Sequence, residues 1–142
     1  MVGHARPMSF ARVGRGLFEV SYGSVQDMQP ELQRGLLRAI EDELASGPVA
    51  LLFAVNTLDV PRSVPEFWFT VTRRLAPGLC AMAIVSDSLA VRAAASAFSV
   101  TNRVRKVKLE VKAYTVAQAG EARAWCEAAR SVSPLPLRGE GA

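Results

Sequence analysis

Two sets of polar residues are the best placed in this chain to do chemistry, because each follows an apolar segment with the composition of a β-strand. The first set is Thr57, Asp59 and Ser63, and the second set is Ser86, Asp87 and Ser88. The carboxyl ends of neighbouring parallel strands meet at one edge of an open sheet, where ligands commonly bind. We therefore expect the second set to form a ligand-edge loop, and the first to be a partner-binding segment or a phosphosite.

The residue types in these sets do not make up a catalytic group. A serine nucleophile needs a base, and the single histidine of the chain, His4, lies in the N-terminal leader. Asp59 and Asp87 are either a carboxylate pair for a cation or solvated loop residues, and they lack a third ligand. We therefore expect no catalytic residue, no metal, no cofactor and no enzymatic activity.

Ser63 has two interpretations. The segment Ser63–Glu66 has the pattern of a capping box, in which the serine caps a helix and the glutamate completes the box. Ser63 would then have a structural role only. The N-terminus of a helix also favours an anion or a phosphoserine, so the same residue is a candidate phosphosite.

Four short apolar runs alternate with longer segments of helical period, which is the pattern of a single α/β domain. The runs are Leu17–Tyr22, Val49–Val55, Leu79–Val85 and Val107–Tyr114. The second and third runs are apolar throughout, as in central strands that are covered on both faces. We predict a mostly parallel sheet of about four to five strands with helices packed on it. The helices are expected over 28–44, over 63–75, from Leu89 to about Phe98 and over Val116–Ala129.

Three aromatic residues, Phe67, Trp68 and Phe69, are consecutive in the predicted helix 63–75. A helix cannot bury three consecutive side chains on one face, so at least one ring is expected to point away from the sheet. This arrangement indicates a dimer contact, a lid over an apolar pocket, or core filling with one ring partly exposed. We expect a homodimer with Trp68 or Phe69 at its interface.

Charged and apolar residues alternate strictly along Arg105–Tyr114. Such alternation is typical of a strand with one buried face, and lysines guard sheet edges against unwanted pairing. The segment is therefore predicted to be an edge strand. The alternative is a surface for nucleic acid or lipid headgroups. The segment lacks the interleaved aromatic residues of a stacking platform, so we expect no nucleic-acid partner.

The 142 residues suffice for one domain with its own core. Residues 1–15 are rich in arginine and contain no acid, and we expect a flexible basic leader there, with a transit peptide as the alternative. The domain is expected over 16–130, and 131–142 is expected to be a disordered tail. Charges, Pro or Gly interrupt every apolar run, so we expect no integral membrane association and a cytoplasmic location.

Several segments, taken in order, carry a resemblance to a known family. They are Leu51–Val55, Ala83–Ser88 with Val91-Arg92 behind it, the basic strand, and Gly120–Trp125. These segments resemble the SpoIIAA-like proteins of the STAS/SEC14-like superfamily over about residues 17–130. The resemblance implies a STAS-like fold. Anti-sigma-factor antagonists of the STAS group carry an Asp-Ser-Ser/Thr-Gly-type phosphosite after a central strand, whereas this chain has Asn56–Ser63 there and keeps only an isolated serine.

The resemblance and the lack of a catalytic group favour a non-enzymatic regulatory or protein-interaction module in signalling. It would dock a protein partner of unknown identity through the loop 56–63 and the start of the next helix. The alternative is SEC14-like binding of a lipid or other apolar small molecule, with the aromatic helix lining the pocket. A closed apolar cavity would favour the lipid, and a solid core would favour docking. An enzyme is the third alternative.

Overall fold

The two uniformly apolar runs lie side by side inside the sheet of the computed structural model, which describes residues 9–22, 30–55, 63–76 and 78–132. The strands are β1 (Ser9–Gly14), β2 (Leu17–Tyr22), β3 (Val49–Val55), β4 (Leu79–Val85) and β5 (Glu110–Tyr114). The helices are α1 (Pro30–Leu44), α2 (Ser63–Leu75), α3 (Leu89–Val104) and α4 (Ala119–Val132), with a short 3-10 turn, η1 (Val116–Gln118), before α4.

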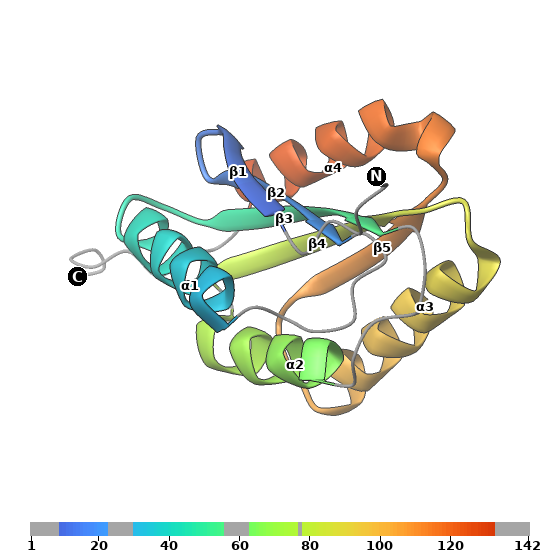
Figure 1. The fold of residues 1–142 in the computed structure, drawn as a ribbon, viewed down its shortest axis with the longest axis horizontal. Helices are drawn as coiled ribbons and strands as arrows, with labels where there is room; N and C mark the ends of the chain where they lie inside the picture. The colour runs from blue at the N-terminus through green and yellow to red at the C-terminus, as the bar shows by residue number, and fades with distance from the viewer. Residues whose placement is uncertain (1–8, 23–29, 56–62, 77, 133–142) are drawn as a thin grey trace, which may run out of the picture.

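The strands follow the order β1-β2-β3-β4-β5 across the sheet (Figure 1). Strands β2 to β5 are parallel, and β1 pairs with β2 as an antiparallel hairpin. Because β3 and β4 each have a strand on both sides and helices over both faces, apolar residues suit every position in them. The predicted α/β class with a mostly parallel sheet is confirmed, as are the central place of these two strands and the edge position of β5.

Helices form a layer on each face of the sheet (Figure 1). On one face, α1, α2 and α3 pack on large side chains of the strands such as Leu51 and Phe53. On the other face, α4 packs on small ones such as Ala81 and Ala83, and its Cys126 is fully buried. The two sets alternate along each strand because successive side chains point to opposite faces. The small residues let α4 lie close to the sheet.

The folded part of the chain reaches closer to both termini than predicted. Ser9–Gly14 forms β1, so the flexible leader predicted over residues 1–15 is wrong for these six residues, and residues 1–8 lie outside those described. The strand is held by pairing with β2 and by packing of Phe10 on the core. At the other end, α4 includes the first two residues of the predicted tail, and 133–142 lie outside the described ranges.

Helix α3 is longer than predicted and β5 is shorter. The helix continues to Val104, well past the end predicted near Phe98. It ends where Lys106 takes a positive φ of 61° and the N–H of Val107 donates to the backbone oxygen of Asn102 at 2.8 Å. Glycine normally occupies such a left-handed position, so a lysine there gives no sequence signal for the end of the helix. Only Glu110–Tyr114 then pairs with β4.

The β1–β2 hairpin is tied to α1 through the carboxylate of Glu43. Its oxygens accept hydrogen bonds from Nε and Nη2 of Arg12, each at 3.0 Å, and from the N–H of Gly16 at 2.7 Å. The hydrogen bonds from Arg12, and then that from Gly16, hold the pKa of the Glu43 carboxyl below its usual range despite its partial burial. The native state therefore favours the charged carboxylate.

We predict that Glu43→Gln lowers the free energy of unfolding by about 1 kcal/mol at neutral pH. The estimate is modest because the side chain of Arg12 is 54% exposed and the ion pair is screened by water. Since the folded pKa lies below the unfolded value of about 4.3, this contribution is complete above that value and is lost as the pH falls through the folded pKa. Urea unfolding between pH 3 and 7, taken as a rough span, should show the two proteins converging at the acid end. A difference that does not depend on pH would contradict the assignment.

Candidate functional site

The second set of polar residues, Ser86–Ser88, lies at the carboxyl end of β4 and is used to build the fold. The hydroxyl of Ser86 is buried and accepts a hydrogen bond from the N–H of Ser88 at 3.0 Å. The hydroxyl of Ser88 accepts from the N–H of Val91 at 3.2 Å, as the N-cap of α3. A guanidinium N–H of Arg92 donates to the backbone oxygen of Ser86 at 2.8 Å. These bonds end β4 and start α3.

Asp87 connects two neighbouring segments at the same edge of the sheet. Its carboxylate accepts a hydrogen bond from the N–H of Val116 at 3.0 Å, and the N–H of Ser86 donates to the backbone oxygen of Tyr114 at 2.9 Å. The end of β4 is thereby fixed to the end of β5 and the start of η1. The predicted ligand-edge loop thus serves as a structural connection in this fold, and a ligand role for it stays a prediction.

The first set of polar residues falls largely outside the described chain. Thr57 and Asp59 lie in the undescribed segment 56–62, and so does the predicted docking loop. Ser63 begins α2 at the predicted residue, but its side chain is also outside the description. The partner-binding, phosphosite and capping interpretations of this set therefore stay predictions.

The three consecutive aromatic residues of α2 are packed inside the chain. Trp68 is 3% exposed, and its ring meets Phe53 edge-on with centroids 4.9 Å apart. Phe67 contacts the other side of Trp68 at 5.0 Å, and Phe69 lies 4.7 Å from Phe98 of α3. Trp68 is thus not available to a partner in this fold. Of the two residues predicted at the dimer interface, the half-buried Phe69 is the one left, and the dimer contact stays a prediction.

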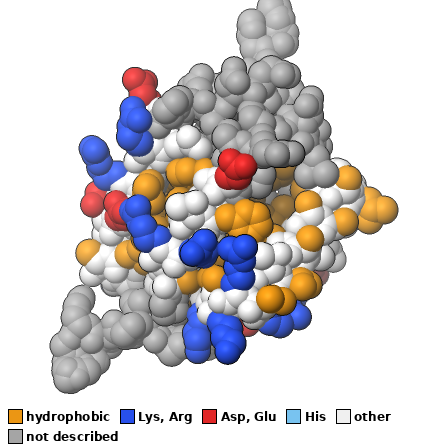
Figure 2. All heavy atoms as spheres, turned by 90° about the horizontal axis from the view of Figure 1, so that it is seen from below, with side chains coloured by type: hydrophobic (Ala, Val, Ile, Leu, Met, Phe, Trp, Pro, Cys, Tyr) orange, Lys and Arg blue, Asp and Glu red, His pale blue; other side chains and the backbone are white. Residues whose placement is uncertain are grey.

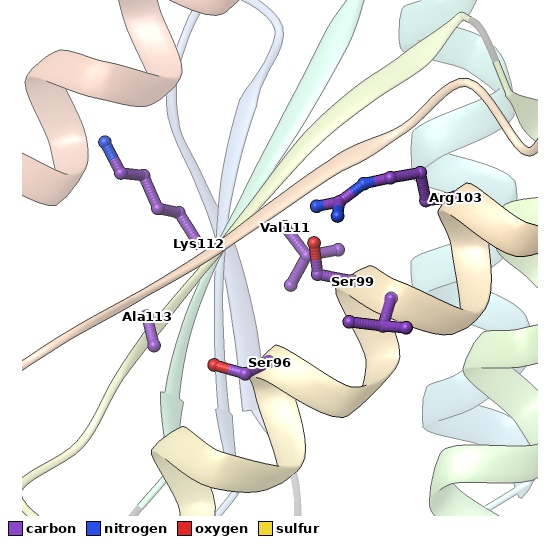
Figure 3. A pocket seen from close by; sticks show the side chains of 7 residues that line it. Ser96, Ser99, Arg103, Val111, Lys112 and Ala113 are labelled. Atoms are coloured by element: carbon purple, nitrogen blue, oxygen red, sulfur yellow. The ribbon is translucent and has the colours of Figure 1, made fainter.

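A groove of about 380 Å³ lies between α3 and β5 (Figure 3). Helix α3 and strand β5 supply its walls through Ser96, Ser99, Val100, Arg103, Val111, Lys112 and Ala113. In Figure 3 the side chains of Ser96, Ser99 and Arg103 extend from α3 toward β5, whereas Lys112 points to the opposite side of the strand, toward α4. The groove therefore runs along the outer edge of the sheet.

Strand β5 presents free backbone groups to this groove. Within the described chain β5 pairs only with β4. In a parallel pair, a residue whose N–H and C=O face the neighbouring strand alternates with one whose groups point away. The backbone oxygen of Tyr114 faces β4, because it accepts from Ser86. By alternation Lys112 faces β4 as well, and the N–H and C=O groups of Val111 and Ala113 point to the open side.

The helical wall of the groove carries Val100 and Arg103, and Val104 lies next to it on α3. Val100 and Val104, one turn apart on α3, are 52% and 74% exposed. Arg103 is exposed, and among the described residues its guanidinium has no ion-pair partner. Figure 2 views the molecule from the side of α2 and α3 and shows apolar side chains next to Lys and Arg on this face. Exposed apolar residues beside a free cation and an open strand are typical of a docking surface.

Sequence reasoning found the edge strand but missed the groove. The predicted helix ended near Phe98, which left Val100, Arg103 and Val104 in a turn and loop. The spacing of Ser96, Ser99, Val100 and Arg103, at three- and four-residue steps, was the available signal for one continuous helix face.

Comparison with models of protein families, with curated proteins and with solved structures finds no match for this chain. The resemblance to SpoIIAA-like proteins therefore stays a prediction from the quoted segments. Within the described ranges, none of the helices combines the length and the apolar character needed to cross a membrane.

Proposed function

We propose that this protein is a non-enzymatic protein-interaction module, and that the groove between α3 and β5 is its docking surface. The observation that carries the proposal is the edge of β5, open within the described chain, which faces Val100 and Arg103 on α3. Val100 and the neighbouring Val104 are exposed, and Arg103 has no ion-pair partner among the described residues. Free strand groups satisfy a partner's backbone, and the exposed valines supply apolar contact. The proposed site replaces the loop 56–63 as the main docking surface.

The packing of α2 supports docking over the alternative function, the binding of a lipid or other apolar small molecule. The rings expected to line an apolar pocket contact one another and also Phe53 and Phe98. A ligand of that kind would have to displace the buried Trp68. The groove beside β5 is open and lined by serine, arginine and lysine as well as valine, which suits a peptide better than an acyl chain.

The proposed setting of this module is regulatory and cytoplasmic, as expected of a SpoIIAA-like protein. Two strands with uniformly apolar sequence, an edge strand preceded by basic residues, and a final helix occur in the order on which the resemblance was based. Self-association through Phe69 is kept as a secondary proposal, to be measured by sedimentation.

We predict that the double variant Val100→Glu/Val104→Glu loses its protein partners while it stays folded. Both side chains are largely in water in the free protein, so glutamate is tolerated there, but in a complex each would bury a charge in an apolar contact. Tagged full-length protein would be purified from the source cells, and co-purifying proteins would be quantified by mass spectrometry. We expect at least one of them to fall by about tenfold or more.

Two matched variants make this experiment specific. Ala128→Glu places a single glutamate on the exposed side of α4 and should leave the co-purifying proteins unchanged. Leu89→Glu places it at the other end of α3, where Leu89 is 73% exposed. Loss of partners with Leu89→Glu but not with the double variant would move the docking surface to the carboxyl edge of the sheet and contradict the proposal.

A further inference from the structure

We propose that the partner of this protein contributes an extended acidic segment, which adds to β5 as the next strand of the sheet. This inference rests on the proposed docking function and names the chemistry of the occupant. Strand addition to a sheet edge is a general mode of peptide recognition, in which main-chain hydrogen bonds hold the segment and side chains give specificity. Four observations on the groove carry the proposal.

The first observation is the direction of the backbone groups. The N–H and C=O groups of Val111 and Ala113 point away from β4, because Tyr114 faces it and residues alternate along the strand. Both residues line the groove, so an incoming segment reaches these groups directly. The bonds that it forms replace bonds to water and leave the ladder between β4 and β5 intact.

The second observation is the wall beside the edge. Ser96, Ser99 and Arg103 lie on one face of α3 and extend toward β5 (Figure 3). Side chains of an added strand point alternately to the two faces of the sheet. Those on the α3 face would meet the two serine hydroxyls and the guanidinium. Those on the α4 face would meet Lys112, which points to that side.

The third observation is the charge of the groove and its surroundings. The segment from Ser96 to Ala113 carries five basic residues and one acid, Glu110. One cation, Arg103, serves the α3 face of an added strand, and another, Lys112, serves the α4 face. An incoming strand with carboxylates on both faces therefore meets a basic side chain on each face. Complementary charge of this kind favours the correct partner and speeds its encounter.

The fourth observation disfavours a second copy of this chain as the occupant of the edge. Two copies that met at this edge would bring together Lys112 of each β5 and the basic residues Arg105, Lys106 and Lys108 that precede each strand. Like charges on opposed strands are destabilising, and lysines on edge strands serve to prevent such pairing. An acidic segment removes this repulsion and turns the same lysines into contacts.

The test uses uniformly labelled full-length protein and a synthetic peptide that repeats Glu-Glu-Val-Val over about ten residues, enough for one strand. This repeat places glutamate on both faces of an extended chain. We expect the peptide to slow amide exchange of Val111 and Ala113 by about tenfold or more and to give intermolecular contacts with β5 in NMR spectra. A Lys-Lys-Val-Val peptide should not bind. A Glu peptide with N-methyl groups on alternate residues should bind about tenfold more weakly, since it lacks backbone donors.

Protein variants complete the test. Arg103→Glu should weaken binding of the Glu peptide by about tenfold. Arg34→Glu, the same charge change on the exposed side of α1, should alter this binding by no more than about twofold. Ala113→Pro removes an N–H that points outward and should weaken binding by about tenfold without breaking the sheet. If that variant fails to fold, Arg103→Glu and the N-methylated peptide still test whether the Glu peptide binds as an added strand.

Equal binding of the Glu and Lys peptides, equal binding of the N-methylated peptide, or no protection of the two amides at millimolar peptide would each overturn the inference. These outcomes are distinct from failure of the docking function itself. If Val100→Glu/Val104→Glu still loses its cellular partners while the peptide leaves Val111 and Ala113 unprotected, the docking surface stands and the strand addition is wrong.

Discussion

Replacing Trp68 by alanine should lower the free energy of unfolding by about 3–5 kcal/mol. The ring is 3% exposed and lies between α2 and the central strand, edge-on to Phe53 at 4.9 Å. Its removal leaves a cavity that the surrounding side chains fill only in part, and it also removes two aromatic contacts. Chemical denaturation followed by circular dichroism measures the loss directly.

Phe67→Ala is the matched control for this prediction. Phe67 contacts the other side of Trp68 but is only half-buried, so its loss should cost about half as much. If Trp68→Ala were no more destabilising than Phe67→Ala, the ring would not be a core residue. The lipid-pocket alternative would then regain support, because a dispensable buried ring is what a ligand could displace.

Gly16→Ala should lower the free energy of unfolding by about 3 kcal/mol. Gly16 has a φ of 67° in the hairpin between β1 and β2, a conformation that side chains disfavour. A Cβ there would lie 2.5 Å from the backbone oxygen of Pro48 and would also overlap the side chain of Arg130. The Pro48 oxygen is backbone and cannot move without shifting the start of β3.

Gly35→Ala is the opposite case and serves as its control. Gly35 lies in the interior of α1, and a Cβ there would meet the ring of Phe10 at 3.7 Å, an ordinary contact. The same substitution should raise the free energy of unfolding by about 0.5–1 kcal/mol, because alanine favours a helix and glycine does not. Thermal unfolding of the two variants should therefore move the melting temperature in opposite directions. A neutral Gly16→Ala would contradict the hairpin geometry.

The sequence predicted the elements whose signals are local. Strands β3 and β4 have the predicted bounds because an unbroken apolar run needs cover on both faces, whatever surrounds it. Helix α2 also has the predicted bounds. In the sequence Ser63 is a helix start signal, and the Pro77-Gly78 pair is a helix stop signal.

The elements that depend on distant contacts were missed. Strand β1 mixes arginine and glycine with apolar residues and becomes a strand through pairing with β2 and through Phe10 on the core. The end of α3 was misplaced because Thr101 and Asn102 have turn preferences. In the structure Asn102 lies inside the helix at 2% exposure, and its backbone oxygen accepts from the N–H of Val107 where the helix ends.

In the candidate site too, features with a local sequence signal were predicted and features that depend on distant contacts were missed. The polar residues Ser86–Ser88, predicted as a ligand-edge loop, form hydrogen bonds with backbone groups of α3, β5 and η1. No sequence pattern reveals these partners. The groove is made from α3 and the edge of β5, and it exists only once the helix is known to continue past Phe98. The edge strand itself was predictable, because charged and apolar residues alternate along Glu110–Tyr114 and the residues before it.

The most direct test of the docking proposal is site-specific photo-crosslinking in the source cells. A benzophenone amino acid would replace Val100 or Val104 at the groove, and Ala128 on the far face of the sheet. The proposal predicts that one partner protein is crosslinked from both groove positions and not from position 128. Crosslinks that form equally from position 128, or none from either groove position, would contradict it.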